Sequence, residues 1–102
     1  MVITKQYSLK GLLMPSQTVV VGSKVGLHAR PASLLAKAAS SSGVAVTVAI
    51  PGQKPVNAAS LLSILALGVK HGVSVEISVA DGDGSDLILS QLVEIVATNH
   101  DE

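Results

Sequence analysis

The sequence predicts an α+β fold, a two-layer open-faced sandwich with the element order βαββαβα. Two segments, residues 44–50 and 73–79, alternate apolar side chains with small or polar ones, which is typical of strands that bury one face. Two others, residues 34–39 and 88–96, repeat apolar residues at helical spacing. With 48% hydrophobic residues, the 102-residue chain can fill one core, and we expect three helices on one face of the sheet.

The first two elements flank a loop that carries a histidine. Residues 18–21 are mostly β-branched and predict a strand, after which Gly22, Ser23 and Gly26 mark a loop. Pro31 suits the first turn of a helix, so the helix should begin within a residue or two of His28. The SSSG stretch at residues 40–43 ends it.

The remaining elements follow from turn and capping signals. The strand at residues 44–50, a turn at 51–53 and a short strand at 55–58 predict a hairpin, with Pro55 at a sheet edge. Ser60 is predicted to cap a short helix that ends at Leu67, before Gly68. After a strand at 73–79 and a turn at 81–84, Ser85 is predicted to cap the last helix. The apolar stripe of that helix comprises Ile88, Leu89, Leu92, Ile95 and Val96.

Residues 1–13 are predicted to be an N-terminal extension outside the fold, and residues 14–102 a single domain. The first segment has no periodic apolar face, and Met14 resembles a second chain start. No apolar run approaches the ~18 residues that a membrane span needs, and no signal peptide is recognisable. The absence of cysteine excludes disulfides. We therefore expect a cytoplasmic protein without membrane insertion, and a monomer.

Charge is distributed unevenly along the chain although the net charge is zero. All seven Lys and Arg residues precede all seven Asp and Glu residues. This order favours a basic surface that attracts an acidic partner, with chance segregation as the alternative. Basic residues are few and aromatic residues almost absent, so nucleic acid is not an expected partner.

No metal site and no cofactor are predicted. His71 and His100 show no ligand-like spacing and are expected on the surface and in the tail. Asp81, Asp83 and Asp86 match a calcium loop only in part, because its sixth position lacks Gly and its twelfth lacks Glu. A turn followed by a helix start explains these three carboxylates.

His28 is the main candidate for chemistry. Together with Arg30 it stands at the predicted start of a helix, where free backbone N–H groups and the helix dipole favour an anion. A phosphoryl group is such an anion, an imidazole is neutral and nucleophilic in large part near neutral pH, and a guanidinium can bind phosphoryl oxygens with a planar fork. By chemistry alone, His28 can also be an ordinary surface residue.

The stretch GLHARPA at residues 26–32 resembles the phosphorylation-site signature of the HPr family, the phosphocarriers of the bacterial sugar phosphotransferase system. The resemblance continues through Lys37, the hairpin, the PVNAAS stretch at residues 55–60, residues 67–68 and the last strand and helix, covering about residues 15–98. Around residues 57–60 it is most similar to members from actinobacteria. Val25 departs from the family, where Asn, Ser or Thr is common, so the imidazole orientation is not predicted.

The resemblance implies both a function and a sheet order. It implies that enzyme I phosphorylates His28 at Nδ1, and that His28 then donates the phosphoryl group to the A domain of a sugar permease. Such a protein is a stoichiometric carrier and not an enzyme. The resemblance also implies a four-stranded antiparallel sheet in the order 1-4-2-3. Two alternatives remain: a paralogue that serves a regulatory or dihydroxyacetone kinase phosphorelay, and a small-molecule binding module.

Two further predictions concern partners. Leu61 and Leu62, with Lys37 and Arg30, are predicted to form an apolar docking surface rimmed by positive charge. Either leucine could belong to the core instead, because a short apolar helix must bury one face. Ser60 resembles the regulatory phosphoserine of HPr in many Gram-positive bacteria, which makes a serine kinase a candidate partner. A helix cap alone also explains this serine.

Overall fold

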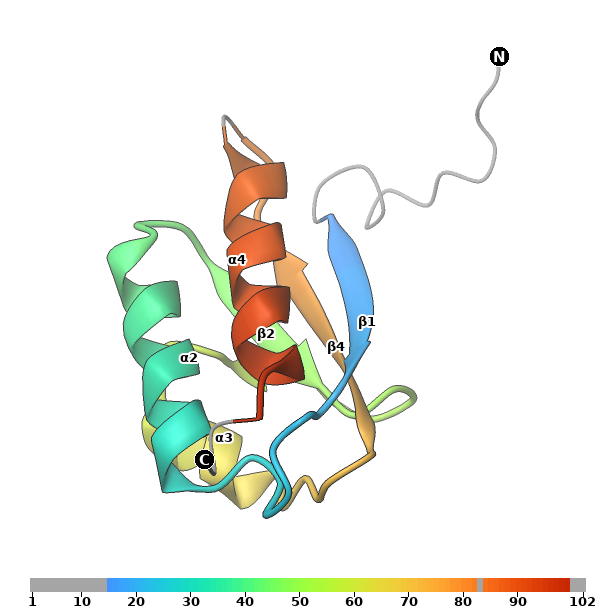
Figure 1. Ribbon diagram of the computed structural model, residues 1–102. Coiled ribbons are helices and arrows are strands. Elements are labelled where there is room, and N and C mark those ends of the chain that lie inside the picture. The colour runs from blue at the N-terminus through green and yellow to red at the C-terminus, as the bar shows by residue number, and fades with distance from the viewer. Residues whose placement is uncertain (1–14, 83, 100–102) are drawn as a thin grey trace.

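The computed structural model describes residues 15–82 and 84–99, and within them it contains the predicted four strands and three helices (Figure 1). They are β1 (Ser16–Val20), α2 (Ala29–Ser41), β2 (Val46–Ala49), β3 (Val56–Asn57), α3 (Leu61–Ala66), β4 (Ser74–Val79) and α4 (Ser85–Ala97). The predicted order of elements is confirmed. The predicted extension, residues 1–13, lies outside the described residues.

The four strands form one antiparallel sheet in the order β1-β4-β2-β3, as expected. The central strand β4 pairs with β1 through Glu76 and Thr18, and with β2 through Ile77 and Val48. Apolar residues on one face of the sheet are fully buried, and Figure 1 shows α2 and α4 against that face. Ser16, Thr18 and Val20 of β1 are exposed. The structure is thus a two-layer α+β open-faced sandwich.

The core is aliphatic, and α2 contributes mainly small side chains to it. Ala32, Leu35 and Ala39 of α2 are buried, as are Leu89 and Leu92 of α4. Alanines on the inner face of α2 let that helix pack closely on either side of Leu35, its large buried side chain. None of the helices in residues 15–82 and 84–99 is long and apolar enough to cross a membrane.

The starts of α3 and α4 give opposite outcomes for the capping predictions. Ser60 is the N-cap of α3, and its hydroxyl accepts a hydrogen bond from the Ser63 N–H, which confirms the prediction. The prediction for Ser85 is wrong: Gly84 is the N-cap of α4, with φ of 80°, and no side chain caps this helix. The chain enters α4 through a left-handed residue, a conformation that glycine adopts at little cost, so Ser85 already lies inside the helix.

Candidate functional site

His28 occupies the N-cap position of α2. Its backbone is extended (φ −83°, ψ −171°), and its carbonyl accepts the first helical hydrogen bond from the Ala32 N–H at 3.0 Å. The half-buried imidazole makes no capping hydrogen bond to the helix. Because the first N–H groups of any α-helix lack partners within the helix, an anion bound beside this imidazole would meet backbone donors and the positive end of the helix dipole.

Backbone hydrogen bonds tie the loop before α2 to two distant segments. The segments are the α3–β4 connection, which accepts two of these bonds, and the last turn of α4. The bonds run from Leu27 N to Val69 O (2.9 Å), from Val21 N to Val73 O (3.0 Å) and from Gly22 N to Val96 O (3.0 Å). The position of His28 therefore depends on the whole fold and not on the loop alone.

Two glycines allow the loop to approach its neighbours this closely. A Cβ atom on Gly22 would collide with the carbonyl group of Ala97. One on Gly26 would collide with the carbonyl oxygen of Val69 and come within 2.8 Å of the Lys70 Cα. Gly26 also has φ of +85°, which side-chain-bearing residues rarely adopt. Both positions therefore require glycine.

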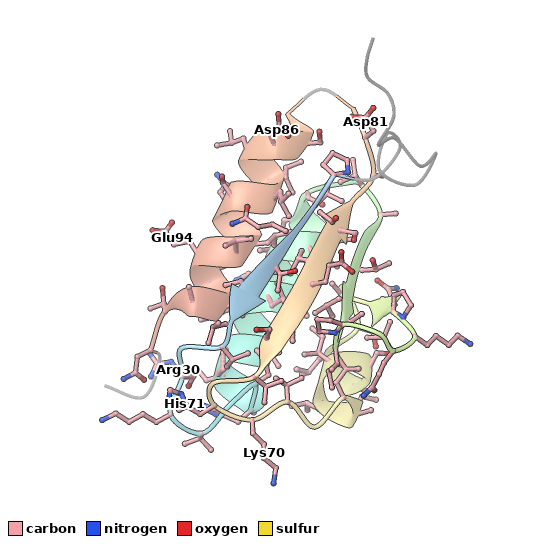
Figure 2. The ribbon with its side chains drawn as sticks, turned by 90° about the vertical axis from the view of Figure 1, so that its right-hand side faces the viewer. Arg30, Lys70, His71, Asp81, Asp86 and Glu94 are labelled. Carbon is pink, nitrogen blue, oxygen red and sulfur yellow. The ribbon has the colours of Figure 1, made fainter. Side chains whose placement is uncertain are left out.

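Two cations, Arg30 and Lys70, lie at the end of the molecule where α2 begins. Arg30, on the first turn of α2, is exposed, and Figure 2 shows it at the same end as Lys70 and His71. Asp81 and Asp86 lie at the opposite end, around the start of α4 (Figure 2). These two carboxylates are thus separated in space from Arg30 and Lys70, whereas Glu94 lies between the two ends. An anionic group or an acidic partner would be attracted to the end that carries His28.

Ser23 is a site residue that the sequence analysis missed. Its hydroxyl oxygen lies 3.2 Å from Nε2 of His28, and its side chain is fully buried. Its carbonyl oxygen accepts a hydrogen bond from Nδ1 of His71 at 3.0 Å. The sequence predicts Ser23 only as a loop residue, because a serine five residues before a histidine matches no periodic pattern. The sequence did offer one signal: Val25 stands where Asn, Ser or Thr is common in the family, so another residue would have to orient the imidazole.

The residues of the predicted docking surface lie on two helices that are in contact, α2 and α3. Leu62 is 79% exposed and Leu61 is 37% exposed, whereas Ile64 is the buried residue of α3. Lys37 is exposed on α2, on the same helical face as Arg30. The core alternative for Leu62 is therefore wrong, and the other three residues are also accessible. From here on, the docking patch means Arg30, Lys37, Leu61 and Leu62.

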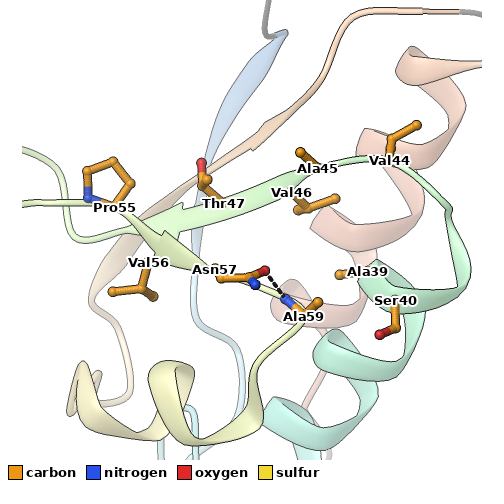
Figure 3. Close-up of a pocket in the computed structure, with 10 residues that line it drawn as sticks. All are labelled: Ala39, Ser40, Val44, Ala45, Val46, Thr47, Pro55, Val56, Asn57 and Ala59. Atoms are coloured by element: carbon orange, nitrogen blue, oxygen red, sulfur yellow. Dashed lines mark hydrogen bonds between the residues drawn. The ribbon is translucent and has the colours of Figure 1, made fainter.

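A surface hollow lies at the other end of α2, between that helix and the β2–β3 hairpin (Figure 3). Its volume is about 450 Å³, and none of its ten lining residues is titratable. Its polar features include the Asn57 side chain, whose oxygen accepts a hydrogen bond from the Ala59 N–H (2.9 Å). The hollow thus offers no charged group to a ligand. Among the described residues, no group of three His, Cys, Asp or Glu could hold a metal ion.

Comparison with known proteins assigns the family. The family model described as "PTS HPr component phosphorylation site" matches residues 15–98. The chain is 42% identical over 89 residues to the phosphocarrier protein HPr of Streptomyces coelicolor, covering 87% of this chain and 95% of that relative. The crystal structure of a phosphocarrier protein HPr from Bacillus anthracis is similar, with a TM-score of 0.73 and 31% sequence identity. The match covers 81% of this chain and 96% of that chain. With the match extending over the whole described fold, the chain belongs to the HPr family of phosphocarrier proteins of the phosphotransferase system.

Proposed function

We propose that His28 is the phosphoryl acceptor and donor of this protein. In this proposal, phosphorylated enzyme I transfers a phosphoryl group to Nδ1 of His28, which passes it to the A domain of a sugar permease. The observation that carries the proposal is the imidazole at the N-cap of α2, where it makes no capping bond of its own. A helix start with a nucleophile in place of a cap can accept an anionic group.

Arg30 is proposed to stabilise the phosphoryl group during transfer. It lies two residues after His28, on the first turn of α2, and is exposed. A guanidinium can donate two parallel hydrogen bonds to phosphoryl oxygens, and its charge persists at every working pH. Transfer of this kind depends mainly on positioning and on charge stabilisation, because the protein has little covalent work to do.

The docking patch is proposed to bind both partners. An exposed leucine pair on α3, together with two exposed cations on the contacting helix α2, suits a partner surface that is apolar in its centre and acidic at its rim. Because the same surface borders His28, each partner would place its own reacting group against the imidazole in turn. The cytoplasmic location and the monomeric state stay predictions of the sequence.

The test is incubation with enzyme I and phosphoenolpyruvate. The expected product carries one acid-labile, base-stable phosphate per chain, and His28→Ala should carry none. His100→Ala, which removes an imidazole without an assigned role, is the matched control and should accept phosphate normally. Phosphate on a folded His28→Ala variant would refute the proposal.

A panel of acceptor domains then separates the two phosphorelay alternatives. Transfer from the phosphorylated protein to A domains of sugar permeases supports the proposed role. Transfer to a dihydroxyacetone kinase partner alone would assign the protein to the other phosphorelay. Absence of any phosphorylation would leave the small-molecule binding module, for which the uncharged hollow in Figure 3 is the place to search.

A further inference from the structure

Ser23 connects two histidines at the end of the molecule where α2 begins. Its hydroxyl contacts Nε2 of His28 at 3.2 Å, and its carbonyl oxygen contacts Nδ1 of His71 at 3.0 Å. A carbonyl oxygen can only accept, so Nδ1 of His71 carries the hydrogen. The serine side chain is fully buried, which keeps water from competing for its hydroxyl.

We propose that Ser23 is a positioning residue for phosphoryl transfer, an inference that rests on the proposed function of His28. The Ser23 hydroxyl accepts a hydrogen bond from Nε2–H and thereby selects the tautomer of His28 whose lone pair is on Nδ1. His71 holds the Ser23 carbonyl and so fixes the backbone from which this hydroxyl projects. Together they determine which nitrogen of His28 reacts.

The loop geometry singles out Ser23 for this role. The Gly26 N–H donates to the Ser23 carbonyl at 2.9 Å, which closes a turn and leaves the serine side chain inside. Val25 has no side-chain donor or acceptor and is 66% exposed, so its side chain cannot orient the imidazole. The same carbonyl receives His71 from the α3–β4 connection, which gives the serine support from two segments.

The hydrogen bond can persist through the whole transfer step. The Nδ1 lone pair forms the N–P bond while the bond between phosphorus and the donor atom of the partner breaks, and that electron pair stays with the donor. Nε2 keeps its proton throughout, so the Ser23 hydroxyl accepts from the same N–H before and after transfer. No reorientation of the ring is required, and this lowers the barrier relative to a ring that rotates freely.

The first test measures the tautomer of His28 and needs no partner protein. In nitrogen-15 NMR spectra, the unmodified protein should show the Nε2–H tautomer of His28. Ser23→Ala should shift His28 toward a mixture of tautomers. Ser78→Ala, which alters a buried serine on β4, is the matched control and should leave the spectrum unchanged. An unchanged His28 tautomer in a folded Ser23→Ala variant would overturn the proposal.

The second test measures the chemistry of transfer from enzyme I. Ser23→Ala should lower kcat about tenfold, as expected for loss of one buried hydrogen bond, with KM unchanged. It should also raise the share of phosphate on Nε2, which phosphorus NMR distinguishes from phosphate on Nδ1. A purely structural serine would lower the melting temperature without changing the phosphorylated nitrogen.

Variants at His71 keep the proposal testable should Ser23→Ala fail to fold. His71 is exposed, so its replacement should leave the fold intact. His71→Ala should also lower kcat, but by less than Ser23→Ala does. His71→Asn, whose amide can donate to the Ser23 carbonyl, should restore kcat. Equal rates for both variants and the unmodified protein would remove His71 from the proposal. Failure of the proposed function would differ, because the unmodified protein itself would take no phosphate.

Discussion

The first turns of α2 and α3 begin with different kinds of N-cap. At α3, the Ser60 hydroxyl accepts a hydrogen bond from the Ser63 N–H at 3.2 Å, so the protein itself satisfies a donor of the helix start. At α2, His28 holds the equivalent position and its side chain makes no such bond. The start of α3 thus has a structural cap, and the start of α2 has the histidine that we propose as the phosphoryl acceptor.

Under the proposed function, this difference means that α2 lacks a stabilising cap at the place where His28 reacts. A serine cap contributes about 1 kcal/mol to a helix, and α2 forgoes it. In exchange, the N–H groups of its first turn can receive an anion. The start of α2 is held from outside instead, through the loop bonds to residues 69, 73 and 96. Five experiments test this difference between the two helix starts.

Gly26→Ala should have the largest effect, because it attacks the outside support of the α2 start. Left-handed strain and a backbone collision with Val69 should together cost about 3 kcal/mol of unfolding free energy in urea titrations. Transfer to His28 should fall as well. Gly52→Ala is the control: φ is +86° there with open space around it, so only about 1 kcal/mol should be lost. Equal losses in the two variants would show that the loop contact does not hold His28.

Arg30→Ala should slow transfer about 100-fold, the usual cost of removing one donor from a transferring group. Its melting temperature should stay the same, because Arg30 is exposed. Arg30→Lys should be intermediate, since a lysine keeps the charge but not the planar fork. Lys54→Ala, which removes an exposed cation between β2 and β3, is the control. Normal transfer rates in the Arg30→Ala variant would show that Arg30 does not stabilise the phosphoryl group.

Leu62→Ala should raise KM for enzyme I about fivefold, equivalent to about 1 kcal/mol of lost apolar contact. The value of kcat should not change, because Leu62 lies in the docking patch and not at His28. Leu87→Ala removes a leucine of similar exposure on α4 and should have no effect. If the proposed charge rim operates, added salt should also weaken binding of the unmodified protein.

Two substitutions at Ser60 separate the cap from the docking surface. Ser60→Ala should cost about 1 kcal/mol of stability and leave transfer unchanged. Ser60→Asp retains a capping oxygen, so stability should persist, but its charge beside Leu61 should repel an acidic partner and slow phosphorylation of His28 a few-fold. This variant imitates only part of the charge that a serine kinase would add. Equal rates in both folded variants would leave Ser60 as a cap alone.

The smallest effect is expected from deletion of residues 1–13. The hydrogen bonds described above for the two helix starts join residues between Val21 and Val96. A chain that begins at Met14 should therefore melt at the same temperature and carry phosphate at the same rate, as calorimetry and the enzyme I assay can measure. Loss of either property would make the extension part of the domain.

The sequence allowed most of the fold to be predicted because its signals are local and periodic. Alternation identified β2 and β4, and Ser60 with Gly68 identified both ends of α3. Ser85 was misplaced because a serine and a glycine both suit an N-cap, and the left-handed backbone at Gly84 decides between them. Residue types alone do not reveal that the N-cap of α4 lies one residue before the predicted one.

The sequence predicts His28 and Arg30 as candidate site residues, but it does not predict the residues that contact the imidazole. His28 and Arg30 follow from the start of a helix and from the family resemblance. Ser23 and His71 do not, because their contacts join an irregular loop to a segment 48 residues away in sequence. The exposure of Leu62 was also undecided, since a six-residue apolar helix can turn either leucine outward.

The backbone hydrogen bonds of the loop before α2 also determine how partial unfolding displaces His28. The Gly22 amide bonds to a carbonyl of α4, so this bond is lost when α4 opens. The Val21 and Leu27 amides bond to carbonyls of the α3–β4 connection, so their bonds are lost when that connection opens. Their hydrogens should exchange with solvent only through the largest unfolding events. In a partly unfolded molecule the imidazole would therefore be displaced, and under the proposed function such a molecule would neither accept nor pass on a phosphoryl group.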